Sequence, residues 1–479
     1  MSGSLFFEGD VMTCELYDDK SDAFHDECGV IGVYLNDKNA ENAANLSYFG
    51  MYSQQHRGQE SSGIAVSDGK SIKIQKGVGL VSDVFQAAGL AALKGHIAVG
   101  HVRYATAGGR TIENAQPMVN KFKLGSIALA HNGQLVNYEP LQEMLEETGC
   151  TFTSTSDTEI ILKLIARDYK KGLENALLSA LKLIKGSFAL CVMTENCLIA
   201  VRDPHGIRPL CLGQVDGGWV VASESCAIDA MNGVFVRDIH PGEVVIISED
   251  GLHSISLTEK ASKQTCIFEY VYFARPDSII DGIPVQEARL KMGEMLAKEN
   301  PVEADVVMGV PDSGIGAALG YSEASGIPYV MGIVKNKYIG RTFIAPTQKE
   351  RENMVFVKLN AIKSDLCGKK VVVIDDSIVR GTTSRRLVQI LRRAGAKEVH
   401  FRVSSPPVKF PCYLGIDTPT KAELISSAHE VEEIRKEIGA DTLSFISLEG
   451  MCEVLRSCNP KNDGYCKGCF CGEYPIAQV

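Results

Sequence analysis

The segment from position 371 to 384 constrains the fold of this chain more than any other. It reads Val-Val-Val-Ile-Asp-Asp-Ser-Ile-Val-Arg-Gly-Thr-Thr-Ser, an apolar run that ends in two acids and a Ser/Gly/Thr loop. The run is typical of a buried strand, and the loop is typical of a turn that opens a helix. A helix start offers unpaired N–H groups and a positive dipole end, so the segment predicts a phosphate site.

The two acids, Asp375 and Asp376, would repel a phosphate in direct contact. They are explained if they bind sugar hydroxyls or a divalent cation beside the phosphate. The alternative is a strand followed by a simple N-capping loop, although a cap needs neither paired acids nor three hydroxyls in a row. The spacing differs from both G-x-x-x-x-G-K-[ST] and G-x-G-x-x-G, so neither a P-loop nor a dinucleotide fingerprint is present.

The pattern of apolar segments divides the 479 residues into two parts, since the chain is too long for one comfortable domain. Residues 28–260 combine clustered short strands with helices in no strict alternation, which predicts an α+β layered sandwich. Beyond about residue 265, strands alternate with helices, which predicts a doubly wound α/β domain with a parallel sheet. The strands expected there are 304–309, 329–333, 370–375 and 398–403, and the helices are 284–299, 314–325 and 383–395.

Charge and composition exclude several classes of protein. The formal net charge of −10 argues against a nucleic-acid binder with a basic surface, and no apolar run reaches the ~18–20 residues that span a bilayer. Residues 1–27 hold eight acids and one lysine, unlike a signal or transit peptide. Fifteen cysteines without a secretory signal should be reduced thiols, metal ligands or catalysts, so we expect a cytoplasmic protein.

The 371–384 segment resembles the phosphoribosyl pyrophosphate (PRPP) loop of type I phosphoribosyltransferases. The resemblance implies that Asp375 and Asp376 hold the ribose hydroxyls. It also implies that the following loop surrounds the 5′-phosphate, with PRPP-binding residues Ser377, Arg380, Gly381, Thr382, Thr383 and Ser384. The strand-end loop 310–314 matches the family's pyrophosphate loop, and its Ser313 would lie with the two acids near Mg²⁺.

The basic and aromatic segment 335–344 lies between these two loops. Alone, it would be read as a solvated loop. In the phosphoribosyltransferase family it resembles a lid that closes over PRPP, with Lys335 and Arg341 reaching the pyrophosphate and water excluded.

Cys28 alone would be read as a core residue. Four polar clusters follow it in the first part of the chain, at 54–60, 101–106, 131–133 and 156–159. As a set they resemble the glutamine-hydrolysing domain of N-terminal-nucleophile amidotransferases. The resemblance implies cleavage of the leader between Glu27 and Cys28. The freed α-amino group, with a pKa near ~8, would then be the general base for the Cys28 thiol.

The same resemblance assigns roles around the nucleophile. Arg103 and Thr106 would bind the α-carboxylate of glutamine, and Asp157 its α-amino group. The side-chain amide of Asn132 and the N–H of Gly133 would form the oxyanion hole.

A glutaminase part followed by a PRPP part resembles the glutamine PRPP amidotransferase family along nearly the whole chain. One branch of that family carries a [4Fe–4S] cluster, whose ligands would be Cys266, Cys412, Cys466 and Cys469. Zinc also suits four cysteines. Because Cys471 forms a C-x-C with Cys469, the choice of terminal ligands stays open.

Membership of this family implies transfer of the glutamine amide nitrogen to PRPP, giving 5-phosphoribosylamine in the first committed step of purine synthesis. It further implies a homotetramer, feedback inhibition by purine nucleotides and internal passage of ammonia. The alternative is a PRPP-sensing regulator without transferase activity. The expected division is an acidic propeptide (1–27), a glutamine amidotransferase domain (28–262), a phosphoribosyltransferase domain (263–450) and a cysteine-rich tail (451–479).

Overall fold

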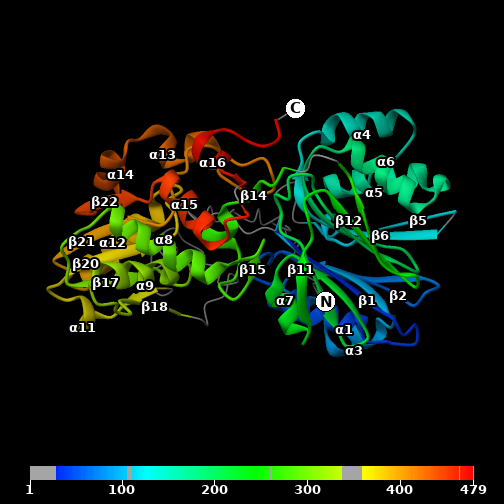
Figure 1. The fold of residues 1–479 in the computed structure, drawn as a ribbon, viewed down its shortest axis with the longest axis horizontal. Coiled ribbons are helices and arrows are strands. Elements are labelled where there is room, and N and C mark those ends of the chain that lie inside the picture. Colours follow the sequence, from blue (N-terminus) through cyan, green and yellow to red (C-terminus); the bar gives the residue numbers. More distant parts are fainter. Residues whose placement is uncertain are drawn as a thin grey trace, which may run out of the picture.

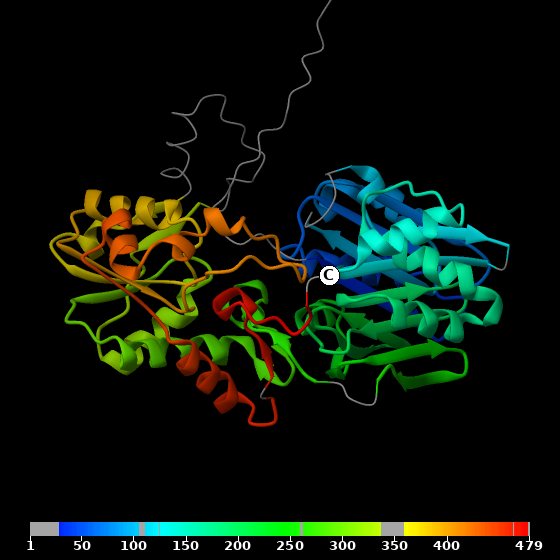
Figure 2. The same ribbon diagram turned by 90° about the horizontal axis from the view of Figure 1, so that it is seen from above.

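The computed structural model describes residues 28–104, 111–123, 125–258, 262–336, 359–462 and 464–477. The expected propeptide, 1–27, lies outside the described residues. Figures 1 and 2 show two halves side by side, with the N-terminal half built on antiparallel sheets and the C-terminal half on a parallel one. The change of architecture falls between strand β13 (Gly251–Ser256) and strand β14 (Thr265–Cys266).

Two antiparallel sheets form the N-terminal half. The first has the order β11-β9-β10-β1-β4-β2-β3 and the second β13-β12-β8-β7-β6-β5. The first contains β1 (Gly29–Leu35), β2 (Ser61–Ser67), β3 (Ile72–Val78), β4 (Ile97–Arg103), β9 (Cys211–Val215), β10 (Gly218–Ala222) and β11 (Val234–Asp238). The second adds β5 (Met118–Phe122), β6 (Gly125–Leu135), β7 (Gly186–Met193), β8 (Leu198–Arg202) and β12 (Glu243–Ser248) to β13.

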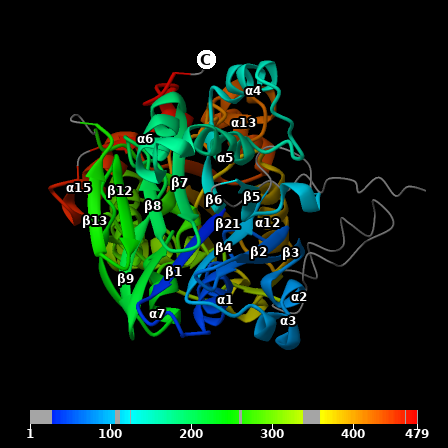
Figure 3. The same ribbon diagram turned by 90° about the vertical axis from the view of Figure 1, so that its right-hand side faces the viewer.

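The two sheets pack face to face because their strands are apolar on both sides. Val30 and Val99 of the first sheet meet Ala130 and Cys191 of the second in one buried core. Helices α1 (Ala43–Ser53) and α7 (Ser225–Ala230) cover the outer face of the first sheet. The outer face of the second carries α4 (Tyr138–Glu147), α5 (Asp157–Asp168) and α6 (Leu173–Leu183). Figure 3 shows the resulting four layers, which confirm the predicted sandwich.

The C-terminal half contains a parallel sheet of order β17-β20-β21-β22, made of β17 (Val306–Gly309), β20 (Lys370–Asp375), β21 (Glu398–Val403) and β22 (Thr442–Phe445). Alternate side chains of β20 face opposite ways. Val372 and Ile374 share a core with α8 (Val285–Glu299) and α9 (Gly314–Ser325). Val371 and Val373 pack with α12 (Thr382–Arg393) and α14 (Val431–Ile438). Helices on both faces confirm the predicted doubly wound domain.

The strand expected at 329–333 differs from the structure. Tyr329 makes only an isolated bridge to Val307, and the regular strand is β18 (Ile333–Lys335), which pairs antiparallel with β19 (Leu359–Ala361). Pro328 lacks an N–H and Gly332 has no side chain to pack, so the pairing with the main sheet is limited to the two hydrogen bonds that Pro328 and Val330 make with Val307.

The C-terminal segment returns to the boundary between the halves. Its strand β23 (Tyr465–Cys466) pairs with β14, and helix α16 (Gly468–Cys471) follows (Figure 2). Helix α15 (Leu448–Cys458) packs against α8 and includes position 450, so the predicted tail begins inside a helix.

The remaining elements are short: α2 (Val81–Val84), α3 (Ala87–Ala92), α11 (Lys363–Leu366), α13 (Ile425–Ala428), β15 (Ile279–Ile280), β16 (Ile283–Pro284), the 3₁₀ turns Ile112–Asn114, Tyr169–Lys171 and Lys421–Glu423, and the π-helical turn Glu269–Phe273. Among the described residues, no helix combines the length and apolar character that crossing a membrane requires.

Candidate functional site

Cys28 directly precedes β1, a central strand of the first sheet. Its side chain is buried, and its Sγ lies 3.5 Å from the carbonyl oxygen of Tyr104, to which it donates. Burial raises the pKa of the Cys28 thiol to about 11, and the charge of Arg103 offsets only part of this effect. The thiol is therefore protonated near neutral pH and needs a base to become a nucleophile.

Asn132 and Gly133 lie on β6, where the two sheets are joined by a 3.1 Å hydrogen bond between His101 Nε2 and the His131 carbonyl. Asn132 is fully buried, yet neither its Nδ2 nor its Oδ1 has a hydrogen-bond partner among the described residues. A buried amide without a partner is costly, so its retention points to a ligand.

Only glycine fits at position 133. Its φ is +141°, and a Cβ there would stand 2.1 Å from the Ser187 carbonyl oxygen. A side chain at position 133 would therefore push against the backbone of β7.

The structure brings Arg103 and Asp157 close to Cys28, since the charges of both act on the Cys28 thiol. Arg103 ends β4 and is buried. Asp157 opens α5; its Oδ2 accepts from the N–H of Leu135 at 2.9 Å, and its Oδ1 lies 3.6 Å from His131 Nδ1. Burial alone would raise the pKa of Asp157, but His131 and the hydrogen bonds hold it below its usual value. Thr106 lies outside the described residues.

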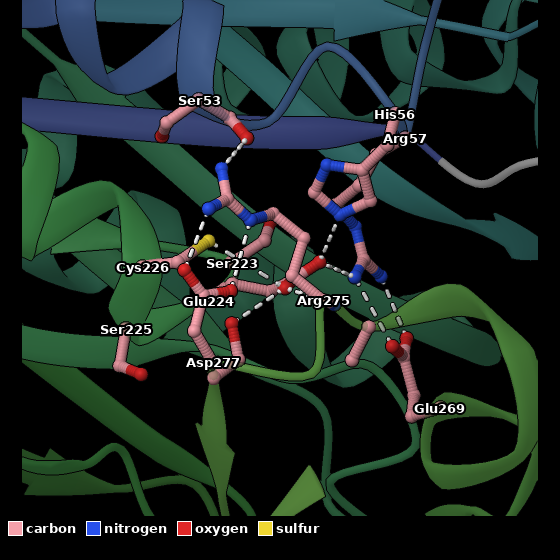
Figure 4. Close-up of polar contacts among 12 residues, drawn as sticks. Ser53, His56, Arg57, Ser223, Glu224, Ser225, Cys226, Glu269, Arg275 and Asp277 are labelled. Atoms are coloured by element: carbon pink, nitrogen blue, oxygen red, sulfur yellow. Dashed lines mark hydrogen bonds and ion pairs between the residues drawn. The ribbon is translucent and has the colours of Figure 1, made fainter. Parts of the chain in front are cut away.

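A buried ion network beside Cys28 joins His56 and Arg57 of the polar cluster 54–60 to two acids that no sequence pattern indicates, Glu224 and Glu269 (Figure 4). Arg57 is fully buried, and its Nε donates to the Cys28 carbonyl oxygen at 3.2 Å. Its guanidinium also binds Glu224 at 2.5 Å and Glu269 at 2.6 Å. Glu269 belongs to the C-terminal half, so Arg57 connects the nucleophile's backbone to that half.

Glu224 receives donors from both halves. His56 Nε2 lies 2.7 Å from its Oε1, while the Ser278 hydroxyl and the Arg275 N–H donate to its Oε2 at 2.7 and 2.9 Å. Burial by itself would raise the pKa of Glu224, but His56 and Arg57 hold it well below its usual range. Glu224 is therefore an ionised link across the junction.

Replacing Glu269 by Gln should destabilise the protein, because Arg57 would keep a buried charge with one carboxylate removed. We expect a loss of about 3 kcal/mol in the free energy of unfolding, measured by urea denaturation. The matched control is Glu249→Gln, which removes an exposed ion pair with Lys38 and should change stability little. Equal stability of the two variants would contradict a structural role for the network.

The carboxyl ends of β17 and β20 meet at the second candidate site. The Val310 N–H donates to the Ile374 carbonyl at 2.8 Å, and a Cβ on Gly314 would stand 2.4 Å from that oxygen. The Ser313 and Ser377 hydroxyls both donate to the buried Asp376 carboxylate, at 2.5 and 2.6 Å. The edge where parallel strands end is the usual place for a ligand in such sheets.

Burial is the main influence on Asp376 and raises its pKa above the usual value. The two serine hydroxyls and the charge of Arg289 partly oppose this shift. Asp375 ends β20, and its Oδ1 accepts from the Asp376 N–H at 3.0 Å. The two acids thus lie together at the sheet edge, as the sequence predicts.

The predicted phosphate loop opens α12, whose first turn contains Thr382, Thr383 and Ser384. Gly381 precedes it with a φ of +80°, a conformation that favours glycine. Arg380 is directed toward Glu423, with 3.4 Å between Nη2 and Oε1. The first-turn N–H groups of a helix have no intrahelical partners, so this turn can donate to a phosphate.

Lys335 ends β18, and its Nζ lies 2.8 Å from Asp312 Oδ2 in the 310–314 loop. The structure thus places this predicted lid residue beside the predicted pyrophosphate loop. Arg341 lies outside the described residues.

The four predicted cluster ligands gather in one region from segments far apart in the sequence. Cys266 on β14 and Cys466 on β23 are directly opposite in register, Cys469 lies in α16, and Cys412 lies in the loop after β21. Burial raises the pKa of Cys266 and of Cys466 to about 12, and neighbouring thiols add to the shift. Cys471 is exposed and donates to the Lys467 carbonyl.

Comparisons with known proteins identify both types of domain. Residues 101–230 match the family model of the glutamine amidotransferase domain, and residues 288–405 match that of the phosphoribosyl transferase domain. The chain is 50% identical over 453 residues to an amidophosphoribosyltransferase of Bacillus subtilis, covering 94% of each. It is 49% identical to that of Archaeoglobus fulgidus, covering 94% of this chain and 98% of the relative.

Two solved structures are similar over 94% of the chain. One is the glutamine PRPP amidotransferase of Bacillus subtilis complexed with ADP and GMP (TM-score 0.89, 49% identity, 98% of that chain). The other is described as the allosteric regulatory enzyme of purine biosynthesis (TM-score 0.90, 50% identity, 97% of that chain). With both domains present in the same order and half of the residues identical, the chain belongs to the amidophosphoribosyltransferase family, which acts at the first step of purine biosynthesis.

Proposed function

We propose that the two sites perform the two half-reactions of this family, with glutamine hydrolysed at Cys28 and PRPP aminated beside Asp376. The observation that carries the proposal is the buried side-chain amide of Asn132, which has no hydrogen-bond partner among the described residues and directly precedes Gly133 on β6. A buried amide donor without a partner in the resting chain suits a transient oxyanion.

In the first half-reaction, removal of the leader converts the Cys28 amide nitrogen into an α-amino group, which takes the thiol proton. The thiolate attacks the side-chain amide carbon of glutamine, and the developing oxyanion accepts from Asn132 Nδ2 and the Gly133 N–H. The proton passes to the departing nitrogen, ammonia is released, and a γ-glutamyl thioester remains on Cys28. Water then hydrolyses the thioester to glutamate. Arg103, Thr106 and Asp157 hold the glutamine backbone.

In the second half-reaction, ammonia attacks C1 of PRPP and pyrophosphate leaves, giving 5-phosphoribosylamine. Asp375 and Asp376 hold the ribose hydroxyls, and the 377–384 loop holds the 5′-phosphate. Lys335 and Arg341 reach the pyrophosphate from the lid. Ser313 and the two acids would hold Mg²⁺, mostly through the substrate, and the metal would neutralise charge on the leaving group. Ammonia passes between the sites inside the protein, because bulk water would protonate it.

Intact-mass measurement of active protein tests the assignment of the nucleophile. We expect a chain that begins at Cys28, because the freed α-amino group would be the base that the buried, protonated thiol needs. A fully active preparation that retains residues 1–27 would contradict the assignment.

We further propose that Cys266, Cys412, Cys466 and Cys469 bind a [4Fe–4S] cluster. These thiols lie close enough to raise one another's pKa. However, no three His, Cys, Asp or Glu side chains in the described ranges surround a single metal-ion position. Four thiolates are the ligand set that a four-iron cluster needs.

Two single substitutions test the ligand set. Cys412→Ser should remove most of the bound iron and the visible absorption of the purified protein, whereas Cys471→Ser should retain both. The expected contrast follows from position, because Cys471 is exposed and Cys412 packs against the buried thiol region. Iron retained by the first variant, or lost from the second, would require a different ligand set.

Three finer properties are proposed from the family. Purine nucleotides would inhibit by binding at the PRPP site and a neighbouring site; the Bacillus subtilis relative was solved with ADP and GMP. The active form would be a homotetramer. A cytoplasmic location is supported by the absence of disulfides among the described cysteines. The alternative of a PRPP-sensing regulator gains no support, because relatives about 50% identical are named as enzymes.

A further inference from the structure

We propose that Leu414 and Gly415, in the C-terminal half, are positioning residues of the glutaminase site. They hold β6 so that the Gly133 N–H stays aimed at the oxyanion. The inference rests on the proposed oxyanion role of Asn132 and Gly133. It adds that a loop from the other half of the chain fixes the position of the oxyanion hole.

The first contact is a buried hydrogen bond between the halves. The Ser187 hydroxyl on β7 donates to the Leu414 carbonyl oxygen at 2.8 Å. The same hydroxyl accepts from the N–H of Gln134, the residue after Gly133, at 3.3 Å. One side chain therefore connects the loop that contains Leu414 to the backbone of the oxyanion strand.

The second contact is backbone against backbone. A Cβ on Gly415 would stand 3.0 Å from Gly133 Cα and 3.1 Å from Gly133 C. On the other side of Gly133, the Ser187 carbonyl already excludes a Cβ. The Gly133 peptide is thus held between β7 and Gly415. The missing side chain of Gly415 permits this approach, and its φ of +97° also favours glycine.

The loop itself is anchored and cannot easily withdraw. Leu414 is fully buried in the same core as Phe470 of α16. The Cys412 N–H donates to Thr418 Oγ1 at 2.7 Å, and the Tyr413 hydroxyl donates to the Ile476 carbonyl at 3.1 Å. A loop fixed at this many points can set the position of the peptide against which it packs.

The expected consequence is kinetic. Oxyanion donors act through preorganisation, so a small displacement of Gly133 weakens binding of the transition state more than binding of glutamine. Substitution of Gly415 should therefore lower kcat of glutamine hydrolysis and leave the KM for glutamine nearly unchanged.

The test compares Gly415→Ala with Gly326→Ala in the full-length mature enzyme. Gly326 also has a positive φ, +72°, but a Cβ there would meet nothing within 4 Å. We expect Gly415→Ala to lower kcat of glutamine hydrolysis about 30-fold, with KM within about 2-fold and the ammonia-dependent rate unchanged. Gly326→Ala should change none of the three. The proposal would be overturned if Gly415→Ala lowered the ammonia-dependent rate as much as the kcat of glutamine hydrolysis, or if it left that kcat unchanged.

Ser187→Ala provides a second test without backbone strain and should lower kcat about 5-fold with the same unchanged KM. If Gly415→Ala does not fold, an unaltered kcat in Ser187→Ala by itself rejects the proposal. Asn132→Ala separates this inference from its premise. If its kcat is normal, the oxyanion assignment fails; if its kcat falls while Gly415→Ala and Ser187→Ala are normal, only the positioning role fails.

Discussion

Cys28→Ala is expected to abolish glutamine-dependent formation of 5-phosphoribosylamine while ammonia-dependent formation continues. Without the thiol no γ-glutamyl thioester can form, and we expect a loss of at least about 1,000-fold. The PRPP loops lie at the carboxyl ends of β17 and β20, in a different sheet from the strand that follows Cys28. The variant's ammonia-dependent rate should therefore be close to that of the unaltered enzyme, with initial rates measured on glutamine and on ammonium salt.

The control for this variant is Cys150→Ser, which changes a partly exposed thiol in the same half. It should retain both activities, because Cys150 has no contact with the site residues described above. A Cys28→Ala enzyme that still uses glutamine would contradict the nucleophile assignment. Equal loss of both activities would instead show that the substitution disturbs the whole protein.

Asp376→Asn should impair both the glutamine-dependent and the ammonia-dependent reaction. The substitution conserves size but removes a buried carboxylate that the Ser313 and Ser377 hydroxyls support. Hydrogen bonds to a charged group contribute about 1.5–3 kcal/mol each, so we expect the KM for PRPP to rise about 100-fold. The measurement is initial rate against PRPP concentration, with each nitrogen source in turn.

The matched control is Glu449→Gln, which removes one charge from an exposed position on α15. It should leave the KM for PRPP unchanged. Glutamine hydrolysis measured without PRPP should be unaffected in Asp376→Asn, since Asp376 belongs to the other half. An unchanged KM for PRPP in Asp376→Asn would show that the ribose is held elsewhere.

The sequence was most informative where a site is built from one continuous segment. The acids, the glycine turn and the hydroxyls of the PRPP loop all fall within residues 371–384, and the structure keeps them together at the end of β20. Both fold classes were also predictable, because strand and helix periodicity is a local property of the chain.

Contacts between distant segments could not be predicted in the same way. Arg57 pairs with Glu224 and Glu269, which are 167 and 212 residues away. No pattern near position 57 indicates which acids will face it, since both arrive through packing of the two halves. The contact of Gly415 with Gly133 could not be predicted either, because a glycine in a loop indicates only a turn and not the distant residue that packs against it.

The apolar run 329–333 shows the limit of periodicity itself. It has the composition of a buried strand, but its pairing with β17 is confined to Val307, which donates to the Pro328 carbonyl and accepts from the Val330 N–H. The regular strand begins at Ile333, the last residue of the expected range, and it pairs antiparallel with β19 instead.

The coupling of the two sites is tested most directly by measuring glutamate and pyrophosphate release together. In the mature wild-type enzyme, PRPP should stimulate glutamine hydrolysis, and the two products should appear in equal amounts. A rate of glutamate release that does not change with PRPP would contradict a coupled two-site transferase. So would glutamate release that exceeds pyrophosphate release severalfold when PRPP is saturating.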